Sequence, residues 1–178
     1  DAWGTLHILV NNLGGGGRWG KTFADTADKT WMEVYEKNAM SAVRFTRMVM
    51  PSMVKQSWGR VVTITSIYGR EAGALGEVRP WYAMAKTAET GLMKVLASDP
   101  AYARKNITFN SVAPGFIMSP GTMLAEEYAK NPEKWAEELR RNFPMGRFGT
   151  PEEVGAVVAF LCSEQASLVN GVSLPVDG

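Results

Sequence analysis

The stretch Gly59-Arg60-Val61-Val62-Thr63-Ile64-Thr65-Ser66 decides the fold of this chain. Its β-branched residues are typical of a central β-strand, and Gly69 interrupts the chain soon after it. Ser66 therefore stands at the carboxyl end of a strand, where open α/β sheets bind their ligands. This position makes Ser66 a stronger candidate for a site residue than an ordinary serine in a turn.

Three other segments have the composition of strands: Leu6 to Val10, Ile107 to Ala113 and Gly171 to Gly178. The first ends in Asn11-Asn12-Leu13 and the glycines Gly14 to Gly17, and the second ends at Pro114-Gly115. Because helical segments separate the strands, we predict a single α/β domain, a doubly wound parallel sheet with helices on both faces. The polar residues and glycines that follow the strands then meet at one edge of the sheet.

The longest helical segment is expected to begin at Asp25 or Thr26, either of which can cap it, and to run to about Lys55. Asn38 lies among apolar core candidates, so its carboxamide needs hydrogen-bond partners or water if it is buried. Two interpretations remain open: a structural asparagine with satisfied hydrogen bonds, or a polar group of a functional site. The residues at this helical spacing are Tyr35, Asn38, Ala42, Phe45 and Val49.

A second helix is expected from Pro80 to about Ala103, with Tyr82 and Lys86 on one face of it. An ammonium that stabilises the phenolate makes a tyrosine useful as an acid or base near neutral pH. The alternative is that the two residues share a surface helix without a joint role. Beside them an apolar stripe is expected to pack or to form a subunit contact: Ala85, Ala88, Leu92, Val95 and Leu96.

Residues 119–145 form an amphipathic, heavily charged segment. Its charges can be a solvated face, or its apolar side chains can line a substrate lid, since long excursions from a compact domain are often functional. The apolar side chains in and beside it are Met118, Met123, Leu124, Tyr128, Trp135 and Phe143. A capping box at Thr150-Pro151-Glu152-Glu153 then predicts a last helix, with Val154, Val157, Val158 and Leu161 facing inward.

The composition excludes several classes of function. The 19 basic and 18 acidic side chains leave a net charge of +1, so neither nucleic acid nor an anionic membrane surface is expected as a partner. One cysteine, Cys162, and one histidine, His7, leave no disulfide framework and no cluster with metal-ligand spacing. Ser66 lacks the Gly-x-Ser-x-Gly elbow of a triad hydrolase. We expect a cytoplasmic protein without a membrane span or a metal site.

Several elements occur together in one order: Asn11-Asn12-Leu13-Gly14, Asn38, Ser66, Tyr82-x-x-x-Lys86, Pro114-Gly115-Phe116-Ile117-Met118-Ser119 and Gly149-Thr150-Pro151-Glu152-Glu153. In this combination the chain resembles the short-chain dehydrogenase/reductase family over essentially its whole length, which implies a Rossmann-like fold. Leu13 stands where that family usually has alanine, and Ser119 where threonine is commoner. The interval from Ser66 to Tyr82 is also longer than usual.

The resemblance implies that Tyr82 is the acid/base at the substrate oxygen and that Ser66 hydrogen-bonds the same oxygen. It implies that Lys86 lowers the phenol pKa and binds the nicotinamide ribose, and that Asn38 holds a water molecule in a proton relay. The implied cofactor is NAD or NADP, with contacts from Asn11, Gly14, Tyr82, Lys86, Pro114, Gly115, Ile117 and Ser119.

The glycine-rich dinucleotide fingerprint of the family is not found in the sequence. At about 30 residues per βαβ unit, we expect roughly 60 to 80 further residues before Asp1, which would carry an N-terminal βαβαβ part. The side chains that choose between NAD and NADP are expected there.

The resemblance implies hydride transfer between nicotinamide and a carbonyl or secondary alcohol. Residues 144–153 are similar to β-ketoacyl carrier-protein reductases, so a 3-oxoacyl thioester is the first substrate expected, and a sugar, polyol or other small alcohol is the alternative. A non-catalytic dinucleotide-binding or assembly protein of the same fold is the competing class, although the intact Ser66, Tyr82 and Lys86 argue against it. The resemblance also implies a homodimer or homotetramer.

Overall fold

The computed structural model describes residues 4–16, 22–71 and 79–178. The first residues, Gly17 and most of the loop before Pro80 therefore lie outside the described residues. Within them, four parallel strands form one sheet in the order β1-β2-β3-β4, which confirms the predicted α/β class. The strands are β1 (Ile8–Asn11), β2 (Gly59–Ile64), β3 (Ile107–Pro114) and β4 (Ser173–Val176).

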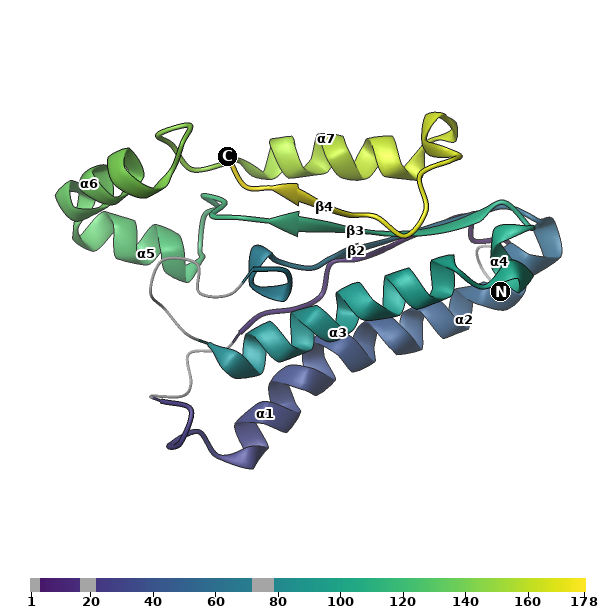
Figure 1. Cartoon of the computed structure of the whole chain (residues 1–178), viewed down its shortest axis with the longest axis horizontal. Coiled ribbons are helices and arrows are strands. Elements are labelled where there is room, and N and C mark those ends of the chain that lie inside the picture. The colour runs from purple at the N-terminus through teal and green to yellow at the C-terminus, as the bar shows by residue number, and fades with distance from the viewer. Residues whose placement is uncertain (1–3, 17–21, 72–78) are drawn as a thin grey trace.

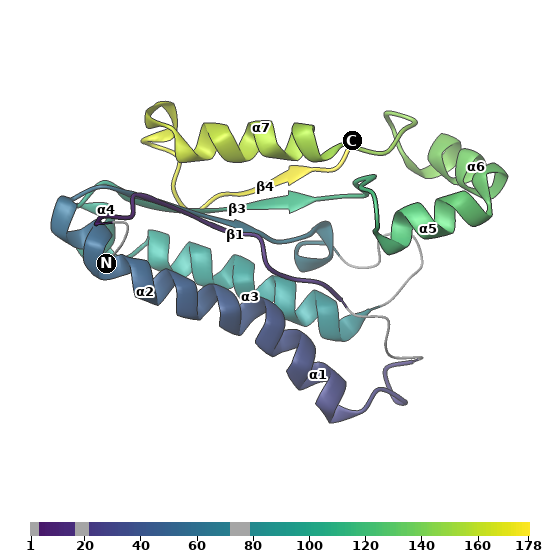
Figure 2. The ribbon, with the colours of Figure 1, turned by 180° about the vertical axis from the view of Figure 1, so that it is seen from behind.

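Helices cover both faces of the sheet (Figure 1). One face carries α1 (Asp28–Tyr35), α2 (Ser41–Gln56) and α3 (Pro80–Ala97), and the other carries α7 (Pro151–Cys162). Figure 2, from behind, shows α2 and α3 running side by side along the sheet. Two helices, α5 (Met123–Lys130) and α6 (Pro132–Asn142), lie beyond the carboxyl ends of the strands. Short turns complete the chain: η2 (Ile67–Gly69), α4 (Pro100–Ala103) and η4 (Glu164–Ala166).

The core has two layers because successive strand residues face opposite sides of the sheet. In β2, Val61 packs against side chains of α2 and α3, whereas Val62 packs with Leu161 of α7. Burying a side chain of this size contributes about 1.5 to 3 kcal/mol. The inward face predicted for the last helix is thus confirmed, since Val154, Val157, Val158 and Leu161 all pack in this layer.

The long helix after β1 differs from the prediction at its start. It begins after Ala27, which supplies no side-chain cap. The expected caps are engaged in the preceding turn, where Thr22 Oγ1 donates to Asp25 Oδ2 (2.6 Å) and Thr26 Oγ1 donates to the Thr22 carbonyl (2.6 Å). These local bonds compete with capping, so the helix starts later than Asp25 or Thr26.

A π-helical turn, η1 (Glu36–Met40), separates α1 from α2 and contains Asn38. Such a turn shifts the helix face that follows it. Downstream, Ala42, Thr46 and Val49 are buried, but Phe45 is 47% exposed and was wrongly expected in the core. The other long helix, α3, ends at Ala97 and not near Ala103, because Asp99 caps a separate short helix that has Pro100 at its first position.

The edge strand β1 is covered on one face only. Its Leu9 packs against the core cluster beneath α2 and α3, while Ile8 and Val10 are 47% and 40% exposed. Val10 pairs with Val62 in the sheet register, so it faces the side on which α7 covers β2 and β3.

Candidate active site

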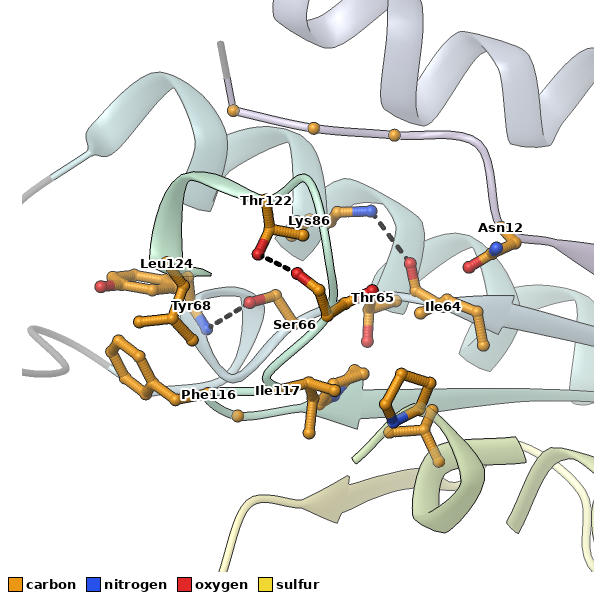
Figure 3. A pocket seen from close by; sticks show the side chains of 18 of the residues that line it. Asn12, Ile64, Thr65, Ser66, Tyr68, Lys86, Phe116, Ile117, Thr122 and Leu124 are labelled. Atoms are coloured by element: carbon orange, nitrogen blue, oxygen red, sulfur yellow. Dashed lines mark hydrogen bonds between the residues drawn. The ribbon is translucent and has the colours of Figure 1, made fainter. Parts of the chain in front are cut away.

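A cavity of about 980 Å³ lies at the carboxyl ends of the strands. Its walls come from the glycines after β1, the end of β2, the first turns of α3, the loop after β3, and the starts of α5 and α7. Segments far apart in the sequence therefore meet at one edge of the sheet, as predicted. Figure 3 shows this cavity from close by, with Ser66 at the centre of the view.

Ser66 follows β2 directly and is 7% exposed. Its Oγ accepts a hydrogen bond from the Tyr68 amide (3.2 Å) and so caps η2 (Figure 3). Tyr82, in the first turn of α3, lines the same cavity as Ser66. The two residues thus lie on the wall of one cavity, and their joint role at a substrate oxygen stays a prediction.

The pKa of Tyr82 lies above its ordinary value. Burial is the largest cause, because it disfavours the phenolate, and the neighbouring Ser66 hydroxyl opposes it. The Glu89 carboxylate raises the pKa further, while the Arg79 guanidinium lowers it. The phenol therefore keeps its proton at neutral pH.

Lys86 is buried one helical turn beyond Tyr82. Its Nζ donates to the Ile64 carbonyl (2.9 Å, Figure 3) and to Glu89 Oε2 (2.9 Å), and it lies 5.8 Å from the centroid of the Tyr82 ring. Glu89 pairs with the Lys86 ammonium, and the expected effect of Lys86 on the Tyr82 pKa stays a prediction.

Asn38 joins the π-helical turn to the glycines after β1. Its Nδ2 donates to the carbonyls of Gly15 (3.0 Å) and Val34 (2.7 Å), and its Oδ1 accepts from the Gly15 amide (3.0 Å). The side chain is fully buried and both amide donors are used, which matches the structural interpretation of Asn38. Its place in a proton relay stays a prediction.

The two asparagines after β1 differ in direction. Asn11 points into the core, where its Nδ2 donates to the hydroxyls of Thr46 and Thr63, each at 3.2 Å. It is not among the residues that line the cavity, although the resemblance implied a cofactor contact. Asn12 does line the cavity (Figure 3). Alternation along the strand gives the reason, since consecutive residues face opposite ways.

The loop after β3 forms the opposite wall. Pro114, Gly115, Ile117 and Ser119 all line the cavity, and their contacts with a cofactor stay a prediction. Backbone hydrogen bonds between residues 116–118 and Gly149 hold this loop, with Gly149 N at 3.0 Å from the Phe116 carbonyl and Met118 N at 2.9 Å from the Gly149 carbonyl.

The segment beyond this loop is only partly what the lid prediction described. Met123 and Leu124 line the cavity, and Thr122 Oγ1 donates to the Ser119 carbonyl (2.7 Å) while capping α5 (Figure 3). The larger side chains pack on one another in an aromatic cluster of Phe116, Tyr128, Trp135, Phe143 and Phe148, and of these Phe116 also lines the cavity.

The charges that line the cavity are basic. Lys37, Arg79 and Lys86 are lining residues, and the described lining contains neither Asp nor Glu. Sequence reasoning missed Lys37, whose only signal is a cation directly before Asn38. Sequence reasoning also missed Glu89. In the sequence it resembles a carboxylate on the surface of a helix, but the structure shows that it is buried.

Metal binding, a membrane span and thiol chemistry find little support in the described residues. No group of three or more His, Cys, Asp and Glu side chains among these residues could hold a metal ion. No helix within them is long and apolar enough to cross a membrane. The Cys162 thiol is free, and burial raises its pKa, which disfavours a nucleophilic role.

Known proteins share this architecture. The family profile described as "Enoyl-(Acyl carrier protein) reductase" matches residues 1–178. A 3-oxoacyl-[acyl-carrier-protein] reductase from Aquifex aeolicus is 39% identical over 97% of this chain and 64% of its own.

Two solved structures from Agrobacterium tumefaciens are also similar. One is a 3-oxoacyl (acyl-carrier-protein) reductase with NADP bound, at 31% identity and a TM-score of 0.87 over 99% of this chain and 65% of its own. The other is a putative 2-deoxy-D-gluconate 3-dehydrogenase with bound NADP, at 31% identity and a TM-score of 0.82 over 97% of this chain and 66% of its own. The chain thus spans slightly less than two thirds of these relatives. It belongs to the short-chain dehydrogenase/reductase family.

Proposed function

We propose that this chain carries the catalytic part of an NAD(P)-dependent oxidoreductase that acts on a carbonyl or a secondary alcohol. One observation carries the proposal: Tyr82 and Ser66, from different elements, line the same cavity at the carboxyl end of β2. Reduction of a carbonyl develops alkoxide charge, which needs a proton and a hydrogen-bond donor at the same oxygen. Tyr82 supplies the proton and Ser66 supplies the donor.

The cavity fits the nicotinamide end of a dinucleotide. Backbone of Gly14, Gly15 and Gly16 forms one wall, and the absence of carboxylates from the described lining suits a ligand that carries phosphates. The residues that would hold the group are Asn12, Gly14, Lys86, Ile117 and Ser119. When bound, the nicotinamide supplies or accepts the hydride.

The charge state of Tyr82 favours reduction near neutral pH. Its raised pKa keeps the phenol protonated, so it is ready to donate a proton to a forming alkoxide. Oxidation of an alcohol needs the phenolate, and we expect this direction to require alkaline conditions.

The basic lining favours an anionic substrate. Lys37 and Arg79 belong to the cavity wall, and their charges attract a phosphate or carboxylate. A 3-oxoacyl thioester on a phosphopantetheine arm has such a phosphate, and the relatives named as 3-oxoacyl reductases support it as the first candidate. A sugar acid is the second candidate, supported by the similar deoxygluconate dehydrogenase.

Residues 119–145 are proposed as the substrate lid, because Ser119, Met123 and Leu124 line the cavity while the aromatic cluster anchors the segment. A homo-oligomer through α2 and α3 is also proposed. Phe45 and Met48 of α2 and Val95 of α3 are 47%, 73% and 68% exposed, which is unusual for side chains of this size on a packed helix pair.

The test is turnover by the full-length protein. The absorbance of NADPH and NADH is followed with 3-oxoacyl thioesters, keto-acids of sugars and neutral ketones. Oxidation of the cofactor with an anionic carbonyl supports the proposal, and the better substrate class separates the two candidates. Tight dinucleotide binding without turnover on any class would favour the non-catalytic alternative.

A further inference from the structure

The glycine segment, residues 14–16, lies in close contact with Tyr82. A Cβ added to Gly16 would lie 3.2 Å from Tyr82 Cγ and 3.3 Å from its Cδ2. These distances are shorter than ordinary carbon contacts, so the backbone of Gly16 packs directly against the phenol ring. Because Gly16 and Tyr82 both line the cavity, their contact belongs to its wall.

A side chain of α3 holds the glycine segment at this place. The indole Nε1 of Trp81 donates a hydrogen bond to the Gly16 carbonyl (3.0 Å). Trp81 is 3% exposed and packs with Val34 and Ala85 in a small core cluster, so its ring has little freedom to turn. The residue directly before Tyr82 therefore holds the backbone that lies against the Tyr82 ring.

The glycine segment needs such attachments because glycine has the least restricted backbone of all residues. Asn38 of η1 supplies one attachment, since it bonds the amide and the carbonyl of Gly15. Trp81 supplies another from α3, at the next residue. Two elements that are separated in the sequence thus fasten adjacent glycines.

We infer that Trp81 is a positioning residue: its indole N–H fixes the glycine segment against the Tyr82 ring and so sets the phenol through Gly16. Tyr68 of η2 lies edge-on to the same ring, with centroids 6.1 Å apart, so Gly16 and Tyr68 both restrict it. An acid must be aimed at the oxygen that it protonates, and a loosened ring loses this aim. The inference deepens the proposed function and rests on it for every statement about turnover.

The competing interpretation is that Trp81 serves packing alone. Trp31 of α1 provides the comparison, because it packs edge-on against Trp81 in the same cluster, with centroids 6.3 Å apart. Trp31 is not among the described residues that line the cavity. Trp31→Phe therefore measures what the loss of an indole in this cluster does by itself.

The first test is hydrogen exchange in the full-length protein, measured by mass spectrometry on peptides that contain residues 14–16. Trp81→Phe keeps an aromatic ring but removes the N–H. We expect exchange in these peptides to become about 5-fold faster, as the loss of one hydrogen bond allows, while Trp31→Phe leaves it unchanged. Unchanged exchange in folded Trp81→Phe, or equal acceleration in both variants, would overturn the inference.

The second test is a double-variant cycle that asks whether Trp81 acts through Gly16. The φ angle of Gly16 is not left-handed, so Gly16→Ala is not strained and acts by pressing a methyl group on the Tyr82 ring. Each single variant should lower kcat by about 5- to 10-fold and leave the KM of the carbonyl substrate within about 2-fold.

The double variant should have a kcat within about 2-fold of the slower single variant, because both changes disturb one contact. A kcat lowered by the product of the two single effects would mean that Trp81 acts elsewhere, and would overturn the inference. A wild-type protein without turnover would refute the proposed function instead, and the exchange measurement would still decide whether Trp81 holds the glycine segment.

Discussion

The packing around Gly14 predicts a large effect from one added methyl group. A Cβ at this position would lie 2.6 Å from Asn38 Oδ1 and 2.9 Å from Lys86 Nζ. Both distances are too short for carbon contacts, so Gly14→Ala must displace two side chains of the site. Neither can move without breaking hydrogen bonds, because Asn38 Oδ1 accepts from Gly15 N and Lys86 is tied to Ile64 and Glu89.

The cost follows from these contacts. Overpacking of a filled interior costs about 1 to 3 kcal/mol, and the lost bond from Gly15 N to Asn38 costs about 1 kcal/mol more. We therefore expect a loss of about 2 to 4 kcal/mol in the free energy of unfolding. For a domain of this size, that corresponds to about 5 to 15 °C in the melting temperature.

Calorimetry of the full-length protein measures this loss, and Gly91→Ala is the matched control. Gly91 lies inside α3, with no atom within 4 Å of an added Cβ. Alanine there should stabilise the protein by about 0.5 to 1 kcal/mol, because glycine is a poor helix former. If Gly14→Ala has the melting temperature of wild type, or if the melting temperatures of both variants shift equally, the described packing around Gly14 is wrong.

Three further predictions concern single side chains. Tyr82→Phe should lower turnover by about 100-fold or more while dinucleotide affinity is kept, and preserved turnover would remove Tyr82 from its role as acid. Lys37→Ala should raise KM for an anionic substrate by about 2- to 5-fold and leave a neutral analogue unaffected. Hydrogen bonds from Arg147 and Thr150 lower the pKa of Glu153 to about 2, so its stabilisation is present above its ordinary pKa and is lost as the pH falls toward 2. Melting curves of wild type and Glu153→Gln should therefore differ at neutral pH and converge in acid; a constant difference would count against this linkage.

The fold could be predicted because its signals are local. The central strand β2 is a short run of β-branched residues, and Thr150 and Glu153 do form the predicted capping box. The predicted site residues after β2 and β3 also meet, since parallel strands place their carboxyl ends at one edge.

The sequence predictions fail where tertiary contacts decide the position of a side chain. Asn11 and Asn12 look alike in sequence, and only the pleat of β1 sends the first into the core and the second into the cavity. Phe45 is exposed although Ala42 and Val49 of the same helix are buried, because helical spacing places the three on one side of α2 but does not show how far its neighbours cover that side. Glu89 was missed for a similar reason, because only the structure shows that it is buried against Lys86.

Transfer of deuterium from the reduced cofactor to the substrate tests most directly the claim that this protein catalyses hydride transfer. The full-length protein would be given reduced nicotinamide cofactor deuterated at the transferable position, together with 3-oxoacyl thioesters and sugar keto-acids, and the products would be examined by mass spectrometry. The account predicts deuterium on the carbinol carbon of one product class, with loss of transfer in Tyr82→Phe. Cofactor that binds but delivers no deuterium to any product, or equal transfer by Tyr82→Phe, would contradict it.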